Sequence, residues 1–211
     1  MLNQKIIETY SKIHNPINYT NDNDVSFDGS QIQFEFFTAW DKINEFYLKN
    51  KPKKLKFLEV GAWKGLWGMA FSEFCKINNI EGTYLTLTMM DQDPNNQPLY
   101  KTLEYINSQN TKANLINLNT LSEQALPEVL SHSDSFDIVF IDAAHDYNSV
   151  MSDIKKFSLL AKDILLFHDI RPKQVTPSCG VYQAILDSNL KLDEEIATND
   201  SLMGIGLIYI K

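Results

Sequence analysis

The feature that most constrains this chain is an alternation, from residue 54 onward, of short apolar runs with longer amphipathic stretches. Such alternation is typical of β-strands joined by helical crossovers, which build a parallel sheet covered by helices on both faces. Most of the runs are apolar on both faces, as strands of that kind must be. The expected strands are residues 56–62, 83–90, 113–118, 136–141, 163–167, 194–198 and 205–210. The sequence therefore predicts an α/β fold with a doubly wound, mostly parallel, seven-stranded sheet.

Helical periodicity of apolar residues predicts the segments between and before the strands. The expected helices are residues 66–78, 98–108, 121–131, 147–161 and 180–188, with two more over 2–13 and 32–47. We divide the chain into an N-terminal part, residues 1–50, which serves as a lid or a packing extension, and a sheet domain over 51–211. Segment 15–29 is rich in Asn and Asp, and we interpret it as an exposed loop that either orders over a ligand or simply connects the leading helices.

Composition narrows the classes of function. The 211 residues carry 27 Asp and Glu against 19 Lys and Arg, a formal net charge of -8, which argues against nucleic acid and acidic membranes as partners. Cys75 and Cys179 form no zinc-binding or disulfide pattern, as is usual in a reducing compartment. We expect a soluble cytoplasmic protein without a membrane span. The sequence leaves the oligomeric state open, with a homodimer as one option.

The first expected strand ends in a turn with two glycines. Gly61 allows a sharp turn and close approach of a ligand, and Gly65 lets the next helix begin near the strand. A dinucleotide fingerprint needs two more glycines, at positions that hold Trp63 and Leu66. Glu59, two residues before the turn, repels a pyrophosphate and attracts a cation. The turn therefore favours a positively charged ligand over a nicotinamide dinucleotide.

Here the chain resembles the class I S-adenosylmethionine-dependent methyltransferases, whose first motif is an acidic residue, one spacer and glycines around a tight turn. Glu59, Gly61 and Gly65 match this motif. The resemblance implies that the segment, with Ala62 and Trp63, binds the methionine end of the cofactor, whose ammonium and sulfonium are both positive. Trp63 departs from the pattern, because many members have a third glycine there.

Polar residues after the second and third strands suit the rest of this cofactor. Asp91 follows the second strand, where an acidic side chain can accept hydrogen bonds from both ribose hydroxyls, and Asp93 is an alternative. Thr120 follows the third strand, beside the adenine edge in related enzymes. Thr120 or Ser122 equally suits the N-cap of the next helix, since Glu123 follows Thr120 at capping-box spacing.

Two carboxylates follow neighbouring strands. Asp142 comes directly after the fourth expected strand and Asp169 after the fifth. Because strands joined by one crossover helix lie side by side, about 4.8 Å apart, both side chains emerge at the same edge of the sheet. Close like charges raise one another's pKa unless a cation lies between them, and a hard divalent cation prefers oxygen ligands. The sequence therefore predicts a site for Mg²⁺ or a similar cation here.

This half also resembles the small metal-dependent O-methyltransferases and their sugar-modifying relatives, in which I-D-x-x-H-x-Y follows strand four and H-D follows strand five. In catechol-type members an Asp after strand four and an Asp-Asn pair after strand five hold the metal. Asp142 and Asp169 match these ligands, whereas Ile170 replaces the Asn. His168, Asp146 or water would have to complete the metal shell. The resemblance also implies that Asp142 belongs to the catalytic and cofactor-binding sets.

Two histidines lie beside these carboxylates. His145 comes three positions after Asp142, where catechol-type enzymes hold the general base. Imidazole titrates near neutrality, so His145 can take a proton from a substrate hydroxyl as the methyl group arrives. His168 precedes Asp169, so in a continuing strand the two side chains point to opposite faces. We therefore interpret His168 first as a buried structural residue and second as a metal ligand.

Together the motifs predict an S-adenosylmethionine-dependent methyltransferase that acts on a hydroxyl of a small molecule or sugar with the help of a divalent cation. By the resemblance, residues 51–211 form a Rossmann-like methyltransferase domain. One alternative is a nicotinamide-dependent oxidoreductase, disfavoured by Glu59 and the missing glycines. Another is a cofactor-binding module without catalysis, suggested by Trp63 and Ile170. The tryptophans of the chain either line an acceptor pocket or pack in the core.

Overall fold

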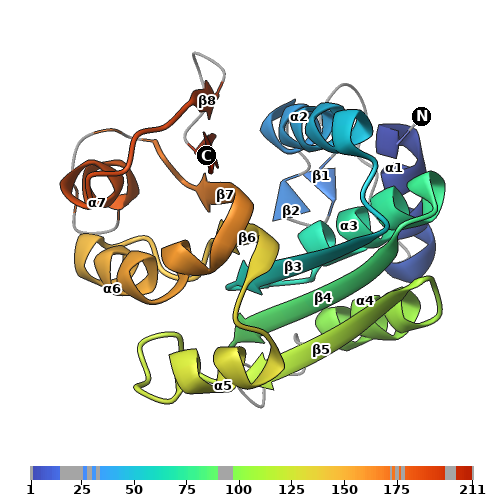
Figure 1. Ribbon diagram of the computed structural model, residues 1–211, viewed down its shortest axis with the longest axis horizontal. Helices are drawn as coiled ribbons and strands as arrows, with labels where there is room; N and C mark the ends of the chain where they lie inside the picture. The colour runs from blue at the N-terminus through green and yellow to red at the C-terminus, as the bar shows by residue number, and fades with distance from the viewer. Residues whose placement is uncertain are drawn as a thin grey trace.

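A seven-stranded sheet forms the centre of the molecule (Figure 1). The computed structural model describes residues 2–14, 26–27, 30–31, 34–89, 97–171, 173, 176, 179–197 and 203–210. The strands are β3 (Lys54–Val60), β4 (Glu81–Thr88), β5 (Thr111–Asn117), β6 (Phe136–Ile141), β7 (Ala161–His168), β8 (Glu194–Ile196) and β9 (Ile205–Tyr209). Their order is β5-β4-β3-β6-β7-β9-β8, with β3 to β7 parallel and β9 antiparallel to both neighbours. The predicted seven-stranded, mostly parallel sheet is confirmed.

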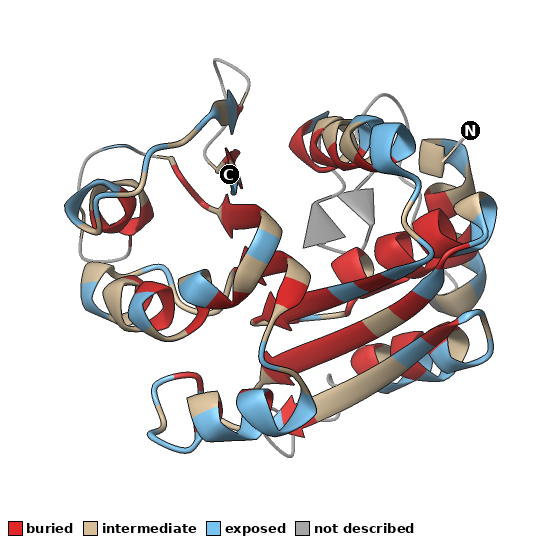
Figure 2. Cartoon of the chain, in the orientation of Figure 1, coloured by how far each residue is buried: buried red, intermediate tan, exposed pale blue. Residues whose placement is uncertain are grey.

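Helices cover both faces of this sheet. One face packs against α1 (Leu2–His14), α2 (Phe34–Asn50), α3 (Leu66–Asn78) and α4 (Gln97–Asn107), and the other against α5 (Ala125–His132), α6 (Tyr147–Phe157) and α7 (Val181–Asp187). Successive strand residues alternate between the two cores: Phe57 and Phe140 face α3, whereas Leu58 and Val139 face α6. Figure 2 accordingly shows the central strands buried along most of their length.

Two helices differ clearly from their predicted ranges. The predicted helix over 121–131 begins only at Ala125, because residues 120–124 form turns. α6 ends at Phe157 and continues as the short 3-10 helix η2 (Ser158–Leu160). Of segment 15–29, predicted as a loop, the structure describes β1 (Ser26–Phe27), which pairs with β2 (Ser30–Gln31) just after the segment, whereas residues 15–25 and 28–29 lie outside the described residues.

The two leading helices pack into the same core as the sheet. α1 buries Ile6 and Tyr10 there, and α2 buries Trp40, Ile43 and Tyr47. Among the helices that the structure describes, none has the length and apolar character needed to cross a membrane. The strand order reverses between β3 and β6, and the carboxyl ends of β3 to β7 meet at one edge of the sheet. Open α/β sheets bind ligands beside such a point, so a ligand site is expected at this edge.

Candidate active site

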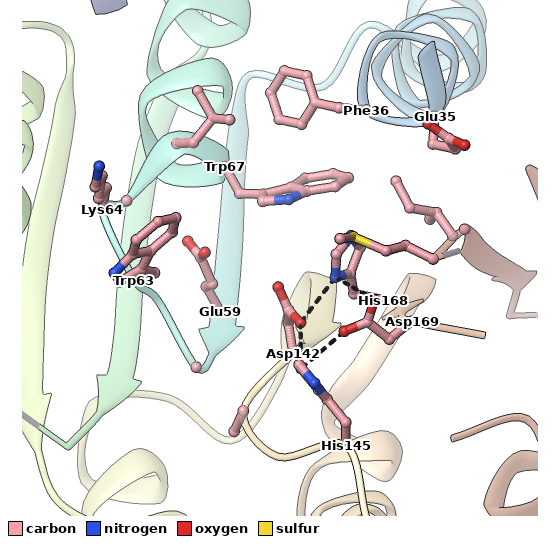
Figure 3. Close-up of a pocket in the computed structure, with 17 residues that line it drawn as sticks. Glu35, Phe36, Glu59, Trp63, Lys64, Trp67, Asp142, His145, His168 and Asp169 are labelled. Carbon is pink, nitrogen blue, oxygen red and sulfur yellow. Dashed lines mark ion pairs between the residues drawn. The ribbon is translucent and has the colours of Figure 1, made fainter. Parts of the chain in front are cut away.

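Two cavities open at the carboxyl edge of the sheet. The larger, of about 390 Å³, lies between the end of β3, the start of α3 and the ends of β6 and β7 (Figure 3). The smaller, of about 310 Å³, is lined by the end of β4, the loop after β5 and the loop after β6. Gly61 and Ala143 line both cavities. The glycine turn predicted from the sequence therefore lies at the junction of the two cavities.

The Gly61 turn is fixed by torsion and by packing. Gly61 has a φ of 93°, and a Cβ at this position would lie 2.3 Å from Ala143 Cα and 2.4 Å from the carbonyl oxygen of Asp142. Only glycine fits where a left-handed φ coincides with backbone this close. Gly65 has a φ of 72° and directly precedes α3, which begins at Leu66. Both glycines thus have the left-handed torsion that a sharp turn requires, whereas the approach of a ligand to Gly61 stays a prediction.

Glu59 lies at the base of the larger cavity and is 3% exposed. The hydroxyl of Tyr84, on β4, donates a hydrogen bond to Glu59 Oε2. Burial raises the pKa of Glu59 to about 8, although the hydrogen bond from Tyr84 opposes the rise. Tyr84 is a site residue that sequence reasoning missed. No local pattern indicates this contact, because it depends on the register of β3 and β4, which pairs Glu59 with Thr86 and puts Tyr84 two residues earlier on the same face.

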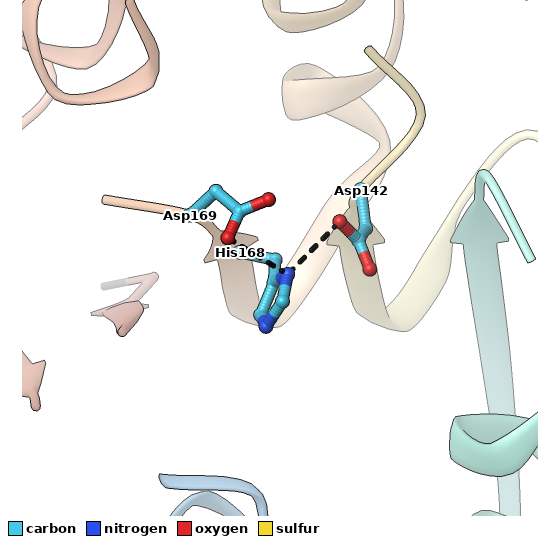
Figure 4. Close-up of side chains that lie close together, drawn as sticks. All are labelled: Asp142, His168 and Asp169. Atoms are coloured by element: carbon cyan, nitrogen blue, oxygen red, sulfur yellow. Dashed lines mark ion pairs between the residues drawn. The ribbon is translucent and has the colours of Figure 1, made fainter. Parts of the chain in front are cut away.

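Four titratable side chains meet where β6 and β7 end. His168 Nδ1 lies 3.2 Å from Asp142 Oδ1 and 3.5 Å from Asp169 Oδ1 (Figure 4). His145 Nε2, from the loop after β6, lies 3.0 Å from Asp169 Oδ2 and 3.5 Å from Asp142 Oδ1. Each imidazole therefore faces both carboxylates. The convergence of Asp142 and Asp169 that the sequence predicted is found, together with both histidines.

The expectation that His168 and Asp169 point to opposite faces is wrong. The register of β6 and β7 pairs Ile141 with Phe167, so Asp142 comes beside His168 rather than beside Asp169. A continuing strand would have turned Asp169 to the other face. Instead Asp169 has a φ of 54°, in the left-handed region, directly after the last residue of β7. The strand alternation ends there, and the Asp169 carboxylate lies beside His168.

The carboxylates and imidazoles of this cluster shift one another's pKa values. Burial acts to raise the pKa of Asp142, but the charges and hydrogen bonds of His168 and His145 outweigh it and hold that pKa below its usual value. The hydrogen bond to Asp142 raises the pKa of His145, against the effect of burial. Burial lowers the pKa of His168, but Asp142 and Asp169 raise it well above its usual value. The carboxylates thus favour positive charge beside them.

The donor atoms in this cluster fit a divalent cation. Asp142, His168 and Asp169 each offer one ligand atom, and these atoms lie within 4.8 Å of one another. Carboxylate oxygens and an imidazole nitrogen are common ligands of divalent metals. Ile170, which replaces the expected Asn, is fully buried in the core. Asp146 Oδ1 instead accepts a hydrogen bond from the Ser149 N–H at 3.2 Å and caps α6. Of the two side chains named as candidates for the third ligand, His168 lies with both carboxylates, whereas Asp146 caps a helix.

Thr120 and Ala62, two further residues predicted to contact the cofactor, lie at the smaller cavity and in the core. Thr120 lines the smaller cavity, and its hydroxyl donates to Asp153 Oδ2 at 3.2 Å. Thr120 does not cap α5, whose first residue is Ala125, so the capping-box interpretation is wrong. The cofactor contact of Thr120 stays a prediction. Ala62 is buried in the core, and Asp91 and Asp93 lie outside the described residues.

Aromatic side chains and one carboxylate line the rest of the larger cavity. Trp63 is exposed, with the Lys64 ammonium 4.4 Å from the centre of its ring, whereas Trp67 packs on Phe140 with ring centres 4.3 Å apart. Glu35 lines the cavity from the first turn of α2 and is 4% exposed (Figure 3). Sequence reasoning missed Glu35, because nothing local indicates that α2 reaches this edge of the sheet.

Comparisons with known proteins identify the family and the fold. The sequence profile of a family described as a methyltransferase domain matches residues 58–170. The O-methyltransferase NovP matches in structure with a TM-score of 0.62 at 11% identity, over 98% of both chains. CalS11, a TDP-rhamnose 3'-O-methyltransferase of calicheamicin biosynthesis, matches with a TM-score of 0.61 at 11% identity, over 96% of this chain and 93% of the other. MycE in complex with Mg and SAH matches with a TM-score of 0.53 at 13% identity, over 81% and 48%.

A search among curated proteins finds no match. The three solved structures are only 11% to 13% identical to this chain in sequence, so their likeness establishes the fold alone. The family match spans more than half of the chain, from the strand before the Gly61 turn to the residue after Asp169. It selects a methyltransferase over the nicotinamide-dependent oxidoreductase that the sequence left as an alternative. The chain belongs to the methyltransferase domain family and is a class I S-adenosylmethionine-dependent methyltransferase.

Proposed function

We propose that this enzyme transfers the methyl group of S-adenosylmethionine to a hydroxyl of a small molecule or sugar, with a divalent cation held by Asp142, His168 and Asp169. The observation that carries the proposal is the convergence of two carboxylates and two imidazoles beside the Gly61 turn. Two similar folds are named O-methyltransferases, and the MycE structure contains Mg and SAH. These names support the proposal but do not identify the acceptor.

We place the two ends of the cofactor in the two cavities. Glu59 and Asp142 line the larger one, and their carboxyl groups suit the positive ammonium and sulfonium. The smaller cavity lies at the end of β4 and after β5, where the sequence predicted the ribose and adenine contacts. Its lining residue Met89 precedes the predicted ribose ligand Asp91 by two positions. The cofactor would then cross the Gly61 turn.

Methyl transfer breaks the bond between sulfur and the methyl carbon and forms a bond from that carbon to the acceptor oxygen. The oxygen approaches the methyl carbon to about 3–3.5 Å, opposite the sulfur, so the protein mainly positions the reactants. When bound, the cation would polarise the acceptor hydroxyl and stabilise its developing negative charge. His145 accepts the hydroxyl proton at Nε2. Asp142 and Asp169 both raise the pKa of His145 and so favour its protonated form, which cannot accept a proton. His145 is neutral, and able to act as a base, when another positive charge offsets the charge of these carboxylates.

The acceptor would occupy the side of the larger cavity near α2. Trp67 and Phe36 present aromatic rings there, and the Glu35 carboxylate can accept hydrogen bonds. Phe36 and Trp67 pack edge to face with ring centres 5.0 Å apart, so this side of the cavity is preformed. Aromatic faces combined with a few polar groups suit a sugar ring or a phenol.

The proposal is tested by measuring release of S-adenosylhomocysteine from S-adenosylmethionine with a panel of sugars and phenols, with and without a chelator. We expect turnover to require restored Mg²⁺ or Mn²⁺, and Asp142→Asn to lower kcat/KM about 100-fold or more. Asp134→Asn, an exposed carboxylate just before β6, is the control and should be silent. Full activity of Asp142→Asn after exhaustive chelation would refute the metal role. Tight cofactor binding without turnover of any sugar or phenol would contradict the proposed class of acceptor.

A further inference from the structure

The loop between β5 and α5 lies outside the catalytic cluster but lines the smaller cavity. Asn119, Thr120 and Leu121 contribute this lining. The loop is a series of turns, in which the Ser122 N–H donates to the carbonyl oxygen of Asn119 at 2.9 Å and the Ala125 N–H donates to that of Ser122 at 3.2 Å. Its shape therefore determines one side of the cavity in which we place the cofactor nucleoside.

Two side chains of α6 hold this loop. Lys156 Nζ donates to the carbonyl oxygen of Thr120 at 2.7 Å and to that of Ser122 at 3.2 Å. Asp153 Oδ2 accepts the hydrogen bond from the Thr120 hydroxyl at 3.2 Å. The loop is thus held through both its backbone and a side chain. Hydrogen bonds to charged groups are stronger than neutral ones, and their loss leaves buried partners unsatisfied.

A buried carboxylate at position 153 lowers the stability of the fold if packing alone is considered. Asp153 is 0% exposed and shares the buried stripe of α6 with Val150, Ile154 and Phe157. Burial raises the pKa of Asp153 to about 6, and its Oδ1 has no hydrogen-bond partner among the described residues. An apolar residue would pack on this stripe without such a penalty. The contacts to the loop, rather than the core, account for a carboxylate here.

α6 also begins at the reaction centre. Its N-cap is Asp146, which directly follows His145, and the His145 carbonyl oxygen accepts a hydrogen bond from the Gly180 N–H at 2.7 Å. The same helix therefore positions the proposed base at one end and the loop after β5 further along. We propose that Asp153 and Lys156 are positioning residues for S-adenosylmethionine, which set its affinity by fixing the loop over residues 119–122. This inference rests on the placement of the nucleoside in the smaller cavity, as proposed above.

The physical basis is preorganisation of the binding loop. A loop already held in its bound shape loses less conformational freedom when a ligand binds, so affinity is higher. Replacing Lys156 by Met keeps most of the side chain but removes both hydrogen bonds to the loop. Lys156 is only partly buried, so we expect this variant to fold. The nucleoside affinity then falls because the loop must be ordered during binding.

Calorimetric titration with two ligands tests the inference. S-adenosylhomocysteine carries both ends of the cofactor, whereas 5'-methylthioadenosine lacks the amino-acid end. We expect Lys156→Met to raise the Kd of both ligands by the same factor, about tenfold. Lys156→Arg, which retains charged donors, should recover most of the affinity. Lys155→Met is the matched control, because Lys155 is exposed on the same helix, and should stay within about twofold of wild type.

Different results would contradict the role of Asp153 and Lys156 and the proposed cofactor site. Wild-type affinity in Lys156→Met, or a loss for S-adenosylhomocysteine without an equal loss for 5'-methylthioadenosine, would overturn the inference alone. Asp153→Leu removes the acceptor of the Thr120 hydroxyl and provides a second measurement, with thermal unfolding as the check that the variant folds. It should weaken both ligands alike, and unchanged affinity in a folded variant would overturn the role of Asp153. A wild-type enzyme that binds neither ligand would refute the proposed cofactor site, and the inference with it.

Discussion

The acidic residues of the site differ in charge because their neighbours differ. Asp142 faces two imidazoles, which hold its pKa below the usual value in spite of burial. Glu59, one strand away, is buried without a cationic partner among the described residues, and its pKa is raised to about 8. A carboxyl with such a pKa retains its proton at neutral pH. A cationic ligand beside Glu59 favours the ionised form, so binding is coupled to loss of that proton.

We expect the affinity for S-adenosylmethionine to rise with pH up to the Glu59 pKa of about 8 and to level above it. Below this pKa, Glu59 is protonated in the free enzyme and ionised in the complex, so binding must remove the proton. The free energy needed to remove it decreases as the pH rises, and the affinity therefore increases with pH. Calorimetry at neutral pH in buffers of different ionisation enthalpy should detect proton release. Glu59→Gln should abolish the release and weaken binding. A pH-independent wild-type affinity would contradict the assignment of Glu59 to the cofactor's cationic end.

At the scale of elements, the ends of strands shape the site. β3 ends in the Gly61 turn, whose φ of 93° brings the backbone against the loop after β6. β7 ends at Asp169, whose φ of 54° breaks the strand alternation. Non-glycine residues are uncommon at positive φ, and such conformations persist where the surroundings enforce them. In both places an irregular residue after a regular strand brings functional groups together.

Gly61→Ala tests whether this close packing is required. A Cβ would lie 2.3 Å from a backbone atom of Ala143, which cannot move as a flexible side chain would. We expect the free energy of unfolding in urea to fall by about 3 kcal/mol or more, with loss of cofactor binding. Asn79→Ala is the control, because Asn79 is exposed with a φ of 54° and reports the cost of the torsion alone. Equal losses in the two variants would contradict the role of packing.

The strands and the Gly61 turn could be predicted from the sequence, whereas the pairing of side chains across neighbouring strands could not. Apolar runs placed all seven strands of the sheet, because buried strands carry a local pattern. The pairing of Asp142 with His168 depends on the register of β6 and β7, which no local pattern gives. α5 begins at Ala125 after turns that Lys156 and Asp153 contact from a later helix, and no local pattern reveals these contacts. Long-range contacts therefore limit prediction of the site more than prediction of the fold.

Residues 1–50 contribute two of the helices that cover the sheet, α1 and α2. The sequence left two roles open, a lid or a packing extension. α1 and α2 lie on the sheet face that also carries α3 and α4 (Figure 1). Trp40 is 0% exposed, with its ring centre 5.6 Å from that of Trp67 and 6.4 Å from that of Phe57. α2 therefore shares the core of the sheet and also presents Glu35 to the larger cavity.

Trp40→Ala distinguishes the two roles. If α2 is a packing extension, the variant leaves a cavity beneath Trp67, and we expect the free energy of unfolding to fall by about 3–5 kcal/mol. Phe34→Ala is the matched control on the same helix, because Phe34 is 62% exposed, and should change stability by less than about 0.5 kcal/mol. A lid closes only over ligand, so its loss would weaken acceptor binding with little change in stability of the free enzyme. Equal stability of Trp40→Ala and Phe34→Ala would therefore favour the lid, because a helix that contributes to the core cannot lose its largest buried side chain without cost.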